Sequence, residues 1–370
     1  MKIGILTSSR ADYGIYYPLL DKLLEDPFYN LEIIAFGTHL SKMHGFTIEE
    51  IEKTDFYKIH KISTLLTNDD ECSIATSYGL TVIKFSEFWS KNKFDLVFCL
   101  GDRFEMSAAV QAGIPFGVKY AHIHGGETTL GSIDNIYRHQ ITLASSLHFT
   151  ASENFTKKVI EILGTSKNVY TVGSLSLAEI HNFSPINKTV FLEKYNIPNE
   201  DFILVTFHPE TNAFEENLKY AIVMRKALSQ IVNYCVVVIT MPNADTLGSI
   251  YRNEISKLKS DYPLRVICIE NFGKQNYFNA MYYSRLMIGN TSSGIIEAAS
   301  FKKFVINIGG RQKGRDQNKN VQNSEYDEKE IISKFNLVFN ANQFIGENIY
   351  SQNNTIDLIE KKLKTFNETL

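Results

Sequence analysis

The chain has 370 residues, which is too long for one typical hydrophobic core and suits two domains. Its 44% hydrophobic and 21% charged residues are the proportions of a soluble globular protein. A formal net charge of -3 excludes a general attraction to nucleic acid or to an anionic membrane, so any polyanion site must be local.

The four cysteines, Cys72, Cys99, Cys235 and Cys268, have no CxxC spacing, and three of them lie in apolar, strand-like runs. This pattern predicts buried free thiols in a reducing compartment. Only a few apolar residues precede the polar stretch 8–12, which argues against a signal peptide. No run approaches the roughly 20 apolar residues of a membrane span. We therefore expect a cytoplasmic protein.

In chain order, short apolar runs predict strands, and longer runs with helical spacing predict helices. In the first half the predicted strands cover residues 2–7, 31–36, 97–100, 118–122, 147–150 and 169–172. Residues 8–14 are expected to form a loop, and helices are expected around residues 19–24, 136–141 and 155–163. Strands that alternate with helices argue for a parallel sheet covered on both faces.

The stretch 183–200, which contains two prolines, predicts a domain boundary, and the alternation restarts after it. Strands are predicted there at residues 202–207, 236–240, 265–269, 286–289 and 304–308, and a helix at 355–366. The predicted fold class is therefore α/β, with two Rossmann-like, doubly wound domains. We expect an N-terminal domain in residues 1–182, a second in 183–353 and a C-terminal helix in 354–370.

Polar residues gather where the predicted strands end, and ligands of open parallel sheets bind outside these carboxyl ends. If the two sheets face each other across a cleft, these side chains converge on one site. They are Arg10, Asp102, His124, Glu127, His208, Asn243, Ser292 and Ser293.

Residues 286–297 combine an apolar run, a polar turn and the start of a helix. Free N–H groups at a helix start attract anions, and the hydroxyls of Ser292 and Ser293, beside Gly294, add donors. Glu297 follows about one turn later, near enough to bind a ribose attached to that phosphate. The alternative is an ordinary N-cap with Glu297 on the exposed face.

Two earlier strand ends also leave alternatives open. Asp102 and Glu105 fit a capping box, yet a carboxylate at a strand end also suits acid–base chemistry. Arg10 is placed to pair with a phosphate or, alternatively, with Asp12. The surrounding segment lacks the GxGxxG pattern, which argues against NAD.

The segment HIHGGE is followed by a helix that carries Asp134 and Arg138 on one face. Its two glycines are expected to let the backbone approach a ligand, with Glu127 projecting from the loop. The alternatives are a surface ion pair between Asp134 and Arg138, and core packing of His122 and His124 with a ring nitrogen bonded to backbone. A zinc site is disfavoured because the carboxylates of this segment suit acid–base chemistry better than metal binding.

Three features of the second half suit a nucleotide. His208 follows a strand and is able to transfer a proton or bind phosphate. The loop 307–315 carries three cations, among them Arg311 and Arg315, which is typical of anion recognition. Phe272 is able to stack on a base, although a core position is the alternative.

Seven motifs occur in order between residues 8 and 315: SSRADYG, GDRFEM, HIHGGETT with IDNIYRH, FHPET, PNADT, GNTSSGIIE and NIGGRQKGR. In this combination the chain resembles the hydrolysing UDP-N-acetylglucosamine 2-epimerases, in particular the bacterial form. The resemblance implies a GT-B-like architecture, with a C-terminal helix that returns to the first domain. It also implies a dimer or tetramer that uses UDP-sugar and needs neither a metal nor another cofactor.

By this resemblance the site residues take specific roles. Those expected at the diphosphate or sugar are Arg10, His208, Ser292, Ser293, Arg311 and Arg315, with Glu297 at the ribose and Phe272 near the uracil. The catalytic candidates are Asp102, Glu127 and Asp134, with Arg138 orienting Asp134. Several relatives carry a carboxylate where His124 stands, so either His124 shares in proton transfer or Glu127 has taken over that role.

The implied reaction eliminates UDP across C1–C2 of the sugar and then adds water, releasing N-acetylmannosamine. The alternatives are the same reaction on a UDP- or GDP-linked 2,4-diacetamido-trideoxyhexose, a non-hydrolysing epimerase, a glycosyltransferase and a non-catalytic sensor. Free N-acetylmannosamine and UDP, as opposed to a UDP-linked manno sugar, separate the hydrolysing from the non-hydrolysing reaction. Turnover with nucleotide sugar and water alone would exclude the acceptor that a glycosyltransferase needs, and a sensor would bind without turnover.

Overall fold

The computed structural model describes residues 1–42, 45–54, 58–66, 68, 70–128, 130, 133–180, 183–210, 213–242 and 247–368. The chain divides into two units. Unit 1 consists of Met1–Glu127, Asp134–His181 and Tyr350–Leu370, and unit 2 of Thr128–Ile133 and Asn182–Ile349.

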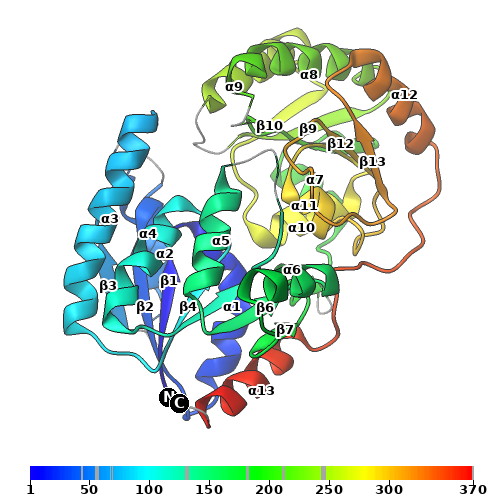
Figure 1. Cartoon of the computed structure of the whole chain (residues 1–370). Coiled ribbons are helices and arrows are strands. Elements are labelled where there is room, and N and C mark those ends of the chain that lie inside the picture. The colour runs from blue at the N-terminus through cyan, green and yellow to red at the C-terminus, as the bar shows by residue number, and fades with distance from the viewer. Residues whose placement is uncertain are drawn as a thin grey trace. The chain divides into compact units, whose positions relative to one another are not determined.

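Unit 1 is built on a 7-stranded sheet in the order β3-β2-β1-β4-β5-β6-β7, in which neighbouring strands pair in parallel (Figure 1). The strands are β1 (Lys2–Thr7), β2 (Asn30–Phe36), β3 (Lys58–Ile62), β4 (Leu96–Leu100), β5 (Tyr120–Ile123), β6 (Leu147–Thr150) and β7 (Val169–Thr171). Because the pairing is parallel, the carboxyl ends of these strands lie along one edge of the sheet.

Helices cover both faces of this sheet. They are α1 (Arg10–Leu24), α2 (Ile48–Glu52), α3 (Glu71–Lys91), α4 (Phe104–Gly113), α5 (Asp134–Ala144), α6 (Glu153–Leu163) and α13 (Thr355–Asn367), with short 3-10 turns η1 (Gly37–Leu40), η3 (Ile114–Phe116) and η4 (Leu175–Leu177). Side chains alternate along a strand, so Ile3 and Ile5 of β1 pack beneath α1 and α13, whereas Leu6 faces α3 and α4.

Two local expectations for unit 1 are wrong, and two elements were not predicted. Helix α1 begins at Arg10, capped by Ser9, so residues 10–14 are helical and not a loop. Helix α4 has Arg103 as its N-cap residue without a side-chain cap, so Asp102 does not form the predicted capping box. The long helix α3 and the edge strand β3 had no prediction.

Unit 2 is built on a 6-stranded parallel sheet in the order β10-β9-β8-β11-β12-β13. The strands are β8 (Phe202–Thr206), β9 (Val236–Thr240), β10 (Val266–Ile269), β11 (Met287–Gly289), β12 (Val305–Ile308) and β13 (Val321–Ser324). The register places Thr206, Gly289 and Asn307 side by side at the carboxyl ends of β8, β11 and β12.

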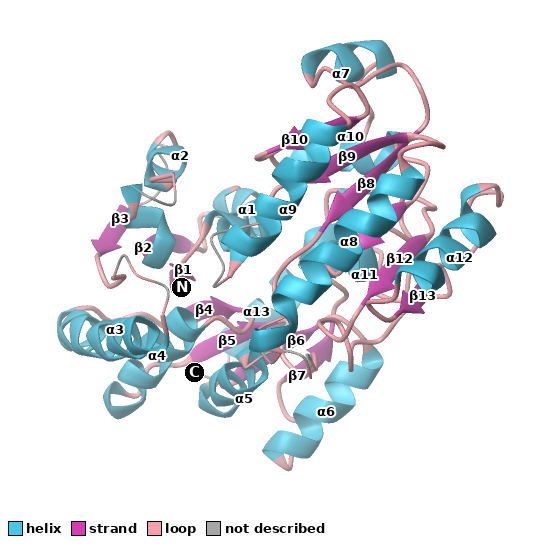
Figure 2. Ribbon diagram, turned by 90° about the horizontal axis from the view of Figure 1, so that it is seen from above, coloured by secondary structure: helices cyan, strands magenta, loops and turns pink. Residues whose placement is uncertain are grey.

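The helices of unit 2 are α7 (Lys188–Lys194), α8 (Asn217–Ile231), α9 (Gly248–Asp261), α10 (Lys274–Tyr283), α11 (Ser292–Ile296) and α12 (Glu328–Phe339), with the 3-10 turn η6 (Phe214–Glu216). Helices α8, α9 and α12 pack on one face of the sheet through a single apolar cluster, and α10 and α11 lie on the other face (Figures 1 and 2). The predicted boundary 183–200 contains helix α7. Helix α11 ends at Ile296, so only the first two residues of the helical-looking run 295–299 are helical.

Each unit is thus a parallel sheet with helices on both faces, and the predicted α/β class with two Rossmann-like domains is confirmed. All four cysteines are free thiols; Cys99 and Cys235 are buried, Cys268 is half-buried and Cys72 is exposed on α3. Within the described ranges, no helix is both long and apolar enough to span a bilayer.

Candidate active site

The carboxyl end of β4 presents Asp102 through a turn at Gly101, whose φ of 75° suits glycine. His122 of β5 holds this turn, because its Nε2 lies 2.9 Å from the Gly101 carbonyl oxygen and must donate to it. Its Nδ1 accepts from the Thr142 hydroxyl at 3.1 Å. Burial lowers the pKa of His122 to about 3, so the ring is neutral. The alternative considered from the sequence therefore holds for His122: it packs in the core with one ring nitrogen bonded to the backbone.

Arg138 of α5 connects the predicted acids of unit 1. Its side chain is buried, forms an ion pair with Asp102 and donates through Nη1 to the Glu127 carbonyl oxygen at 2.6 Å. A surface ion pair, one alternative for Arg138, is therefore wrong. Asp134 lies one turn earlier, at the start of the same helix. The guanidinium fixes both the Asp102 carboxylate and the backbone that carries Glu127.

His124 and Glu127 are both buried next to this ion pair. The Nε2 of His124 accepts from the Leu175 backbone N–H at 3.2 Å, and its Nδ1 lies 3.5 Å from Glu127 Oε1. Because Nε2 accepts, the neutral ring carries its proton on Nδ1, on the side of Glu127. The Nδ1–H group of His124 therefore faces the Glu127 carboxylate.

The two glycines between these residues serve packing within unit 1. Gly126 has a φ of 79°, and a Cβ there would lie 2.4 Å from the Phe155 carbonyl oxygen of α6. A Cβ on Gly125 would lie 3.0 Å from His122 Nδ1. Packing within unit 1 thus accounts for both glycines, and the expectation that they let the backbone approach a ligand stays a prediction.

Arg10 lies at the carboxyl end of β1, at the first position of α1. Its guanidinium is 3.9 Å from Glu50, and both side chains are about half exposed. Asp12, the partner considered from the sequence, instead accepts from the backbone N–H and the hydroxyl of Ser8 at 3.0 and 2.8 Å. Arg10 therefore keeps an accessible position at the strand edge.

In unit 2 the predicted phosphate turn follows β11. Thr291 caps α11 by accepting from the Ser293 backbone N–H at 3.4 Å, and Glu297 follows the last helical residue. The Ser293 hydroxyl lies 2.6 Å from the Tyr277 hydroxyl. Burial raises the pKa of Tyr277 to about 12, so this phenol stays protonated and neutral. Because α11 has only five residues, its dipole is small. We therefore expect the hydroxyls of this turn, including that of Ser292, to contribute more to anion binding than the helix dipole does.

The loop after β12 carries the predicted arginines and is organised by Glu210, a residue to which the sequence assigned no role. The Glu210 Oε1 accepts from the backbone N–H groups of Gly310 and Arg311 at 2.9 and 3.3 Å. Burial raises the pKa of this carboxyl group. A Cβ on Gly309 would lie 2.3 Å from Glu210 Oε1, so the paired glycines were the signal for this contact.

The remaining predicted residues are placed as follows. His208 is buried just after β8, and Gly294 is buried in α11. Arg315 lies in the loop after β12, where its backbone N–H donates to the Gln312 carbonyl oxygen at 3.2 Å. The Phe272 ring is 5% exposed and packs against Phe191 and Tyr195 at centroid distances of 6.0 and 4.6 Å, which favours the core alternative. Asn243 lies outside the described residues.

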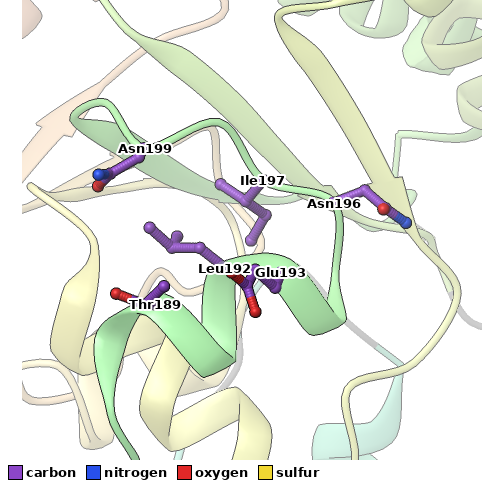
Figure 3. A pocket seen from close by; sticks show the side chains of 6 residues that line it. All are labelled: Thr189, Leu192, Glu193, Asn196, Ile197 and Asn199. Atoms are coloured by element: carbon purple, nitrogen blue, oxygen red, sulfur yellow. The ribbon is translucent and has the colours of Figure 1, made fainter.

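A pocket of about 460 Å³ lies elsewhere on unit 2, beside α7 (Figure 3). It is lined by Thr189, Leu192, Glu193, Asn196, Ile197 and Asn199. With one carboxylate and no cation in its lining, it does not suit a diphosphate. In the described part of the chain, no group of three or more His, Cys, Asp or Glu side chains is arranged to hold a metal ion.

Comparison with known proteins gives consistent results. A protein of Campylobacter jejuni subsp. jejuni named GDP/UDP-N,N'-diacetylbacillosamine 2-epimerase (hydrolyzing) is 34% identical over 88% of this chain and 84% of its own. A protein of Legionella pneumophila named UDP-N,N'-diacetylbacillosamine 2-epimerase (hydrolyzing) is 30% identical over 98% of this chain and 96% of its own.

The fold also matches a solved structure. UDP-GlcNAc 2-epimerase from Neisseria meningitidis, bound to UDP-GlcNAc, superimposes with a TM-score of 0.80 at 17% identity, covering 99% of this chain and 100% of that one. The family described as UDP-N-acetylglucosamine 2-epimerase matches residues 21–364. The chain therefore belongs to the UDP-N-acetylglucosamine 2-epimerase family.

Proposed function

We propose that the chain is a hydrolysing nucleotide-sugar 2-epimerase that converts UDP-N-acetylglucosamine and water into N-acetylmannosamine and UDP. Membership of the family supports the reaction class, and two relatives with "hydrolyzing" in their names support release of the free sugar. The observation that carries the proposal is the group formed by the half-buried Asp102 with the buried Arg138 and Glu127 at the carboxyl edge of the first sheet.

The reaction has two steps with separate demands. In the first, a base removes the weakly acidic C2 proton, the C1–O bond to the diphosphate breaks, and UDP leaves as a 2-acetamidoglucal forms. In the second, a water molecule gives a proton to a base as its oxygen bonds to C1, and a proton is delivered to C2 from the opposite face, which gives the manno configuration. Both steps need carboxyl groups near C2, and the first also needs positive charge at the leaving diphosphate.

Unit 1 supplies the acid–base groups. Asp102 is oriented by its ion pair with Arg138, and Glu127 is held by the His124 side chain and the backbone contact to Arg138. Asp134 starts the helix that carries Arg138, which supports its role as a third acid–base group. His124 shares in these transfers through Glu127, because its Nε2 is occupied by the Leu175 backbone.

Unit 2 supplies the nucleotide site. The hydroxyls of Ser292 and Ser293, the side chain of His208 and the guanidinium groups of Arg311 and Arg315 bind the diphosphate. We propose the same role for Arg10. Glu297 binds the ribose, and Gly294 of α11 belongs to the same site. Cationic side chains and hydroxyl donors stabilise a leaving diphosphate directly, so the reaction needs no cofactor.

A second substrate is favoured by a specific observation. Two relatives that are 34% and 30% identical are named for N,N'-diacetylbacillosamine, the 2,4-diacetamido-2,4,6-trideoxy sugar. The same elimination and hydration apply to it, because the reacting C1 and C2 are unchanged. Either product suits the synthesis of a sialic-type or legionaminic-type acid, which we place in the cytoplasm with the enzyme acting as a homo-oligomer.

Product analysis by NMR in heavy water tests the proposal. We expect free N-acetylmannosamine that carries deuterium at C2, together with UDP in equal amount, and no product from Asp102→Asn. A UDP-linked manno sugar would indicate the non-hydrolysing reaction, and a requirement for an acceptor would indicate a glycosyltransferase. Parallel incubations with UDP-N-acetylglucosamine and UDP-N,N'-diacetylbacillosamine rank the two substrates by kcat/KM.

A further inference from the structure

The carboxyl ends of β8, β11 and β12 meet at Asn290, which directly follows the middle strand. Asn290 is fully buried, and its backbone N–H donates to the Thr206 carbonyl oxygen at 3.1 Å. The preceding Gly289 has a φ of 147°, and a Cβ there would lie 1.8 Å from the same oxygen. The chain therefore passes against the end of β8, which places the Asn290 side chain beside the loop that carries His208.

The Asn290 amide pairs with both backbone groups of His208. Its Oδ1 accepts from the His208 N–H at 2.7 Å, and its Nδ2 donates to the His208 carbonyl oxygen at 2.8 Å. This two-bond ring needs one acceptor and one donor on the same planar group, which only an amide or a protonated carboxyl group provides at this length. The backbone at His208 is thereby fixed from a strand that lies 82 residues away in sequence.

The backbone carbonyl of Asn290 binds the arginine loop. It accepts from Gln312 Nε2 at 2.8 Å and from Arg311 Nη1 at 3.3 Å. A second route runs through the Tyr326 hydroxyl, which accepts from Asn290 Nδ2 at 3.2 Å and hydrogen-bonds to Glu210. Glu210 in turn holds the backbone of Arg311. Both routes link Asn290 to the same loop.

Asn290 also directly precedes the turn that carries Ser292 and Ser293. One buried residue is thus joined to all three segments of unit 2 that are proposed to hold the diphosphate. We infer that Asn290 is a positioning residue that sets the geometry of the diphosphate site without contacting the nucleotide through its own side chain. This inference rests on the proposed function, since it presumes that these loops bind UDP.

Asn290→Asp is the sharpest test because it changes shape very little. An ionised carboxylate cannot donate to the His208 carbonyl or to Tyr326, so the loop with His208 and the arginine loop are no longer held in position. We expect the dissociation constant of UDP, measured by titration calorimetry at neutral pH, to rise by about thirty-fold or more. A protonated carboxyl group restores one donor and one acceptor, so mildly acidic pH should recover much of this affinity relative to wild type.

Asn320→Asp is a matched control. Asn320 is also fully buried and donates to a backbone carbonyl, that of Lys303 at 2.7 Å, but next to the amino ends of β12 and β13. We expect it to lower the melting temperature without changing the UDP affinity by more than about threefold. The same UDP affinity for Asn290→Asp and wild type, or an equal loss in Asn320→Asp, would overturn the inference.

A second variant keeps the test decisive if Asn290→Asp does not fold. Gln312→Met removes one donor to the Asn290 carbonyl at similar side-chain length, and we expect UDP to bind about tenfold more weakly. Unchanged affinity in this variant would refute the role of Asn290. If the wild-type protein does not bind UDP, the proposed nucleotide site is wrong, and the inference about Asn290 is wrong with it. If the wild-type protein binds UDP, the proposed function stands whatever the result for Asn290→Asp.

Discussion

Replacing Gly126 with alanine should destabilise unit 1 strongly, because this glycine is required by both conformation and space. Its φ of 79° lies in the left-handed region, where an L-residue costs about 1–2 kcal/mol. A Cβ would also lie 2.4 Å from the Phe155 carbonyl oxygen and 2.9 Å from Val159 Cγ2. That oxygen belongs to α6 and cannot rotate away, so relieving the contact adds about 1–3 kcal/mol, as overpacked cores do.

The expected loss for Gly126→Ala is therefore about 2–5 kcal/mol, a large part of the stability of a typical domain. Urea unfolding followed by the fluorescence of Trp89 measures it, since this residue is the single tryptophan and is buried in unit 1. Gly79→Ala is the matched control. Gly79 lies in α3, and a Cβ added there would meet no neighbouring atom within 4 Å, so alanine should stabilise the helix by about 0.5–1 kcal/mol.

A change of less than about 0.5 kcal/mol in Gly126→Ala would refute the reasoning, because it would mean that the loop and α6 separate at little cost. A destabilised Gly79→Ala would show instead that the fluorescence reports an effect common to any added methyl group. The pair thus distinguishes a glycine that is held by its neighbours from one that is not.

Three further outcomes are expected. Asp102→Asn should abolish product release while UDP affinity stays nearly unchanged; turnover within a few-fold of wild type, measured by coupled release of UDP, would remove Asp102 from the acid–base group. Ser292→Ala combined with Arg311→Ala should weaken UDP binding by about ten- to one hundred-fold in calorimetry, and unaltered affinity would exclude unit 2 as the nucleotide platform. Unit 1 should lose stability as pH falls below about 6.5, because burial lowers the pKa of His39, His122 and His148 to about 4, 3 and 4. Below pH 6.5 these histidines become protonated in the unfolded chain but stay neutral in the folded chain, which favours unfolding. Each of these histidines contributes a slope of up to about 1.4 kcal/mol per pH unit between its folded pKa and about 6.5, and equal Trp89 unfolding midpoints at neutral and mildly acidic pH would contradict this expectation.

The two parallel sheets were predictable because each central strand is a short apolar run bounded by polar turns. The runs at residues 97–100 and 236–240 became β4 and β9 with boundaries within one residue. The edge strands β3 and β13 were missed, since half-exposed edges carry residues such as His60 and Asn323 that break the apolar pattern. Helix α1 was started too late because Gly14 and Pro18 suggest a loop, although Pro18 lies inside the helix and Ser9 caps it.

The sequence by itself determined the fold class, the family and the strand ends that carry polar groups, since these depend on periodicity and on motifs read within a few residues. Only the tertiary structure decided which partners those groups have: Arg138 bonds Asp102, Glu210 holds the arginine loop, and Asn290 clamps His208. These contacts join residues 36, 100 and 82 positions apart. The paired glycines at 309 and 310 mark a close approach, but no local pattern names the partner of any of these groups. The pairing of polar atoms at the edge of a sheet is set by strand order and register, which exist only after the chain has folded.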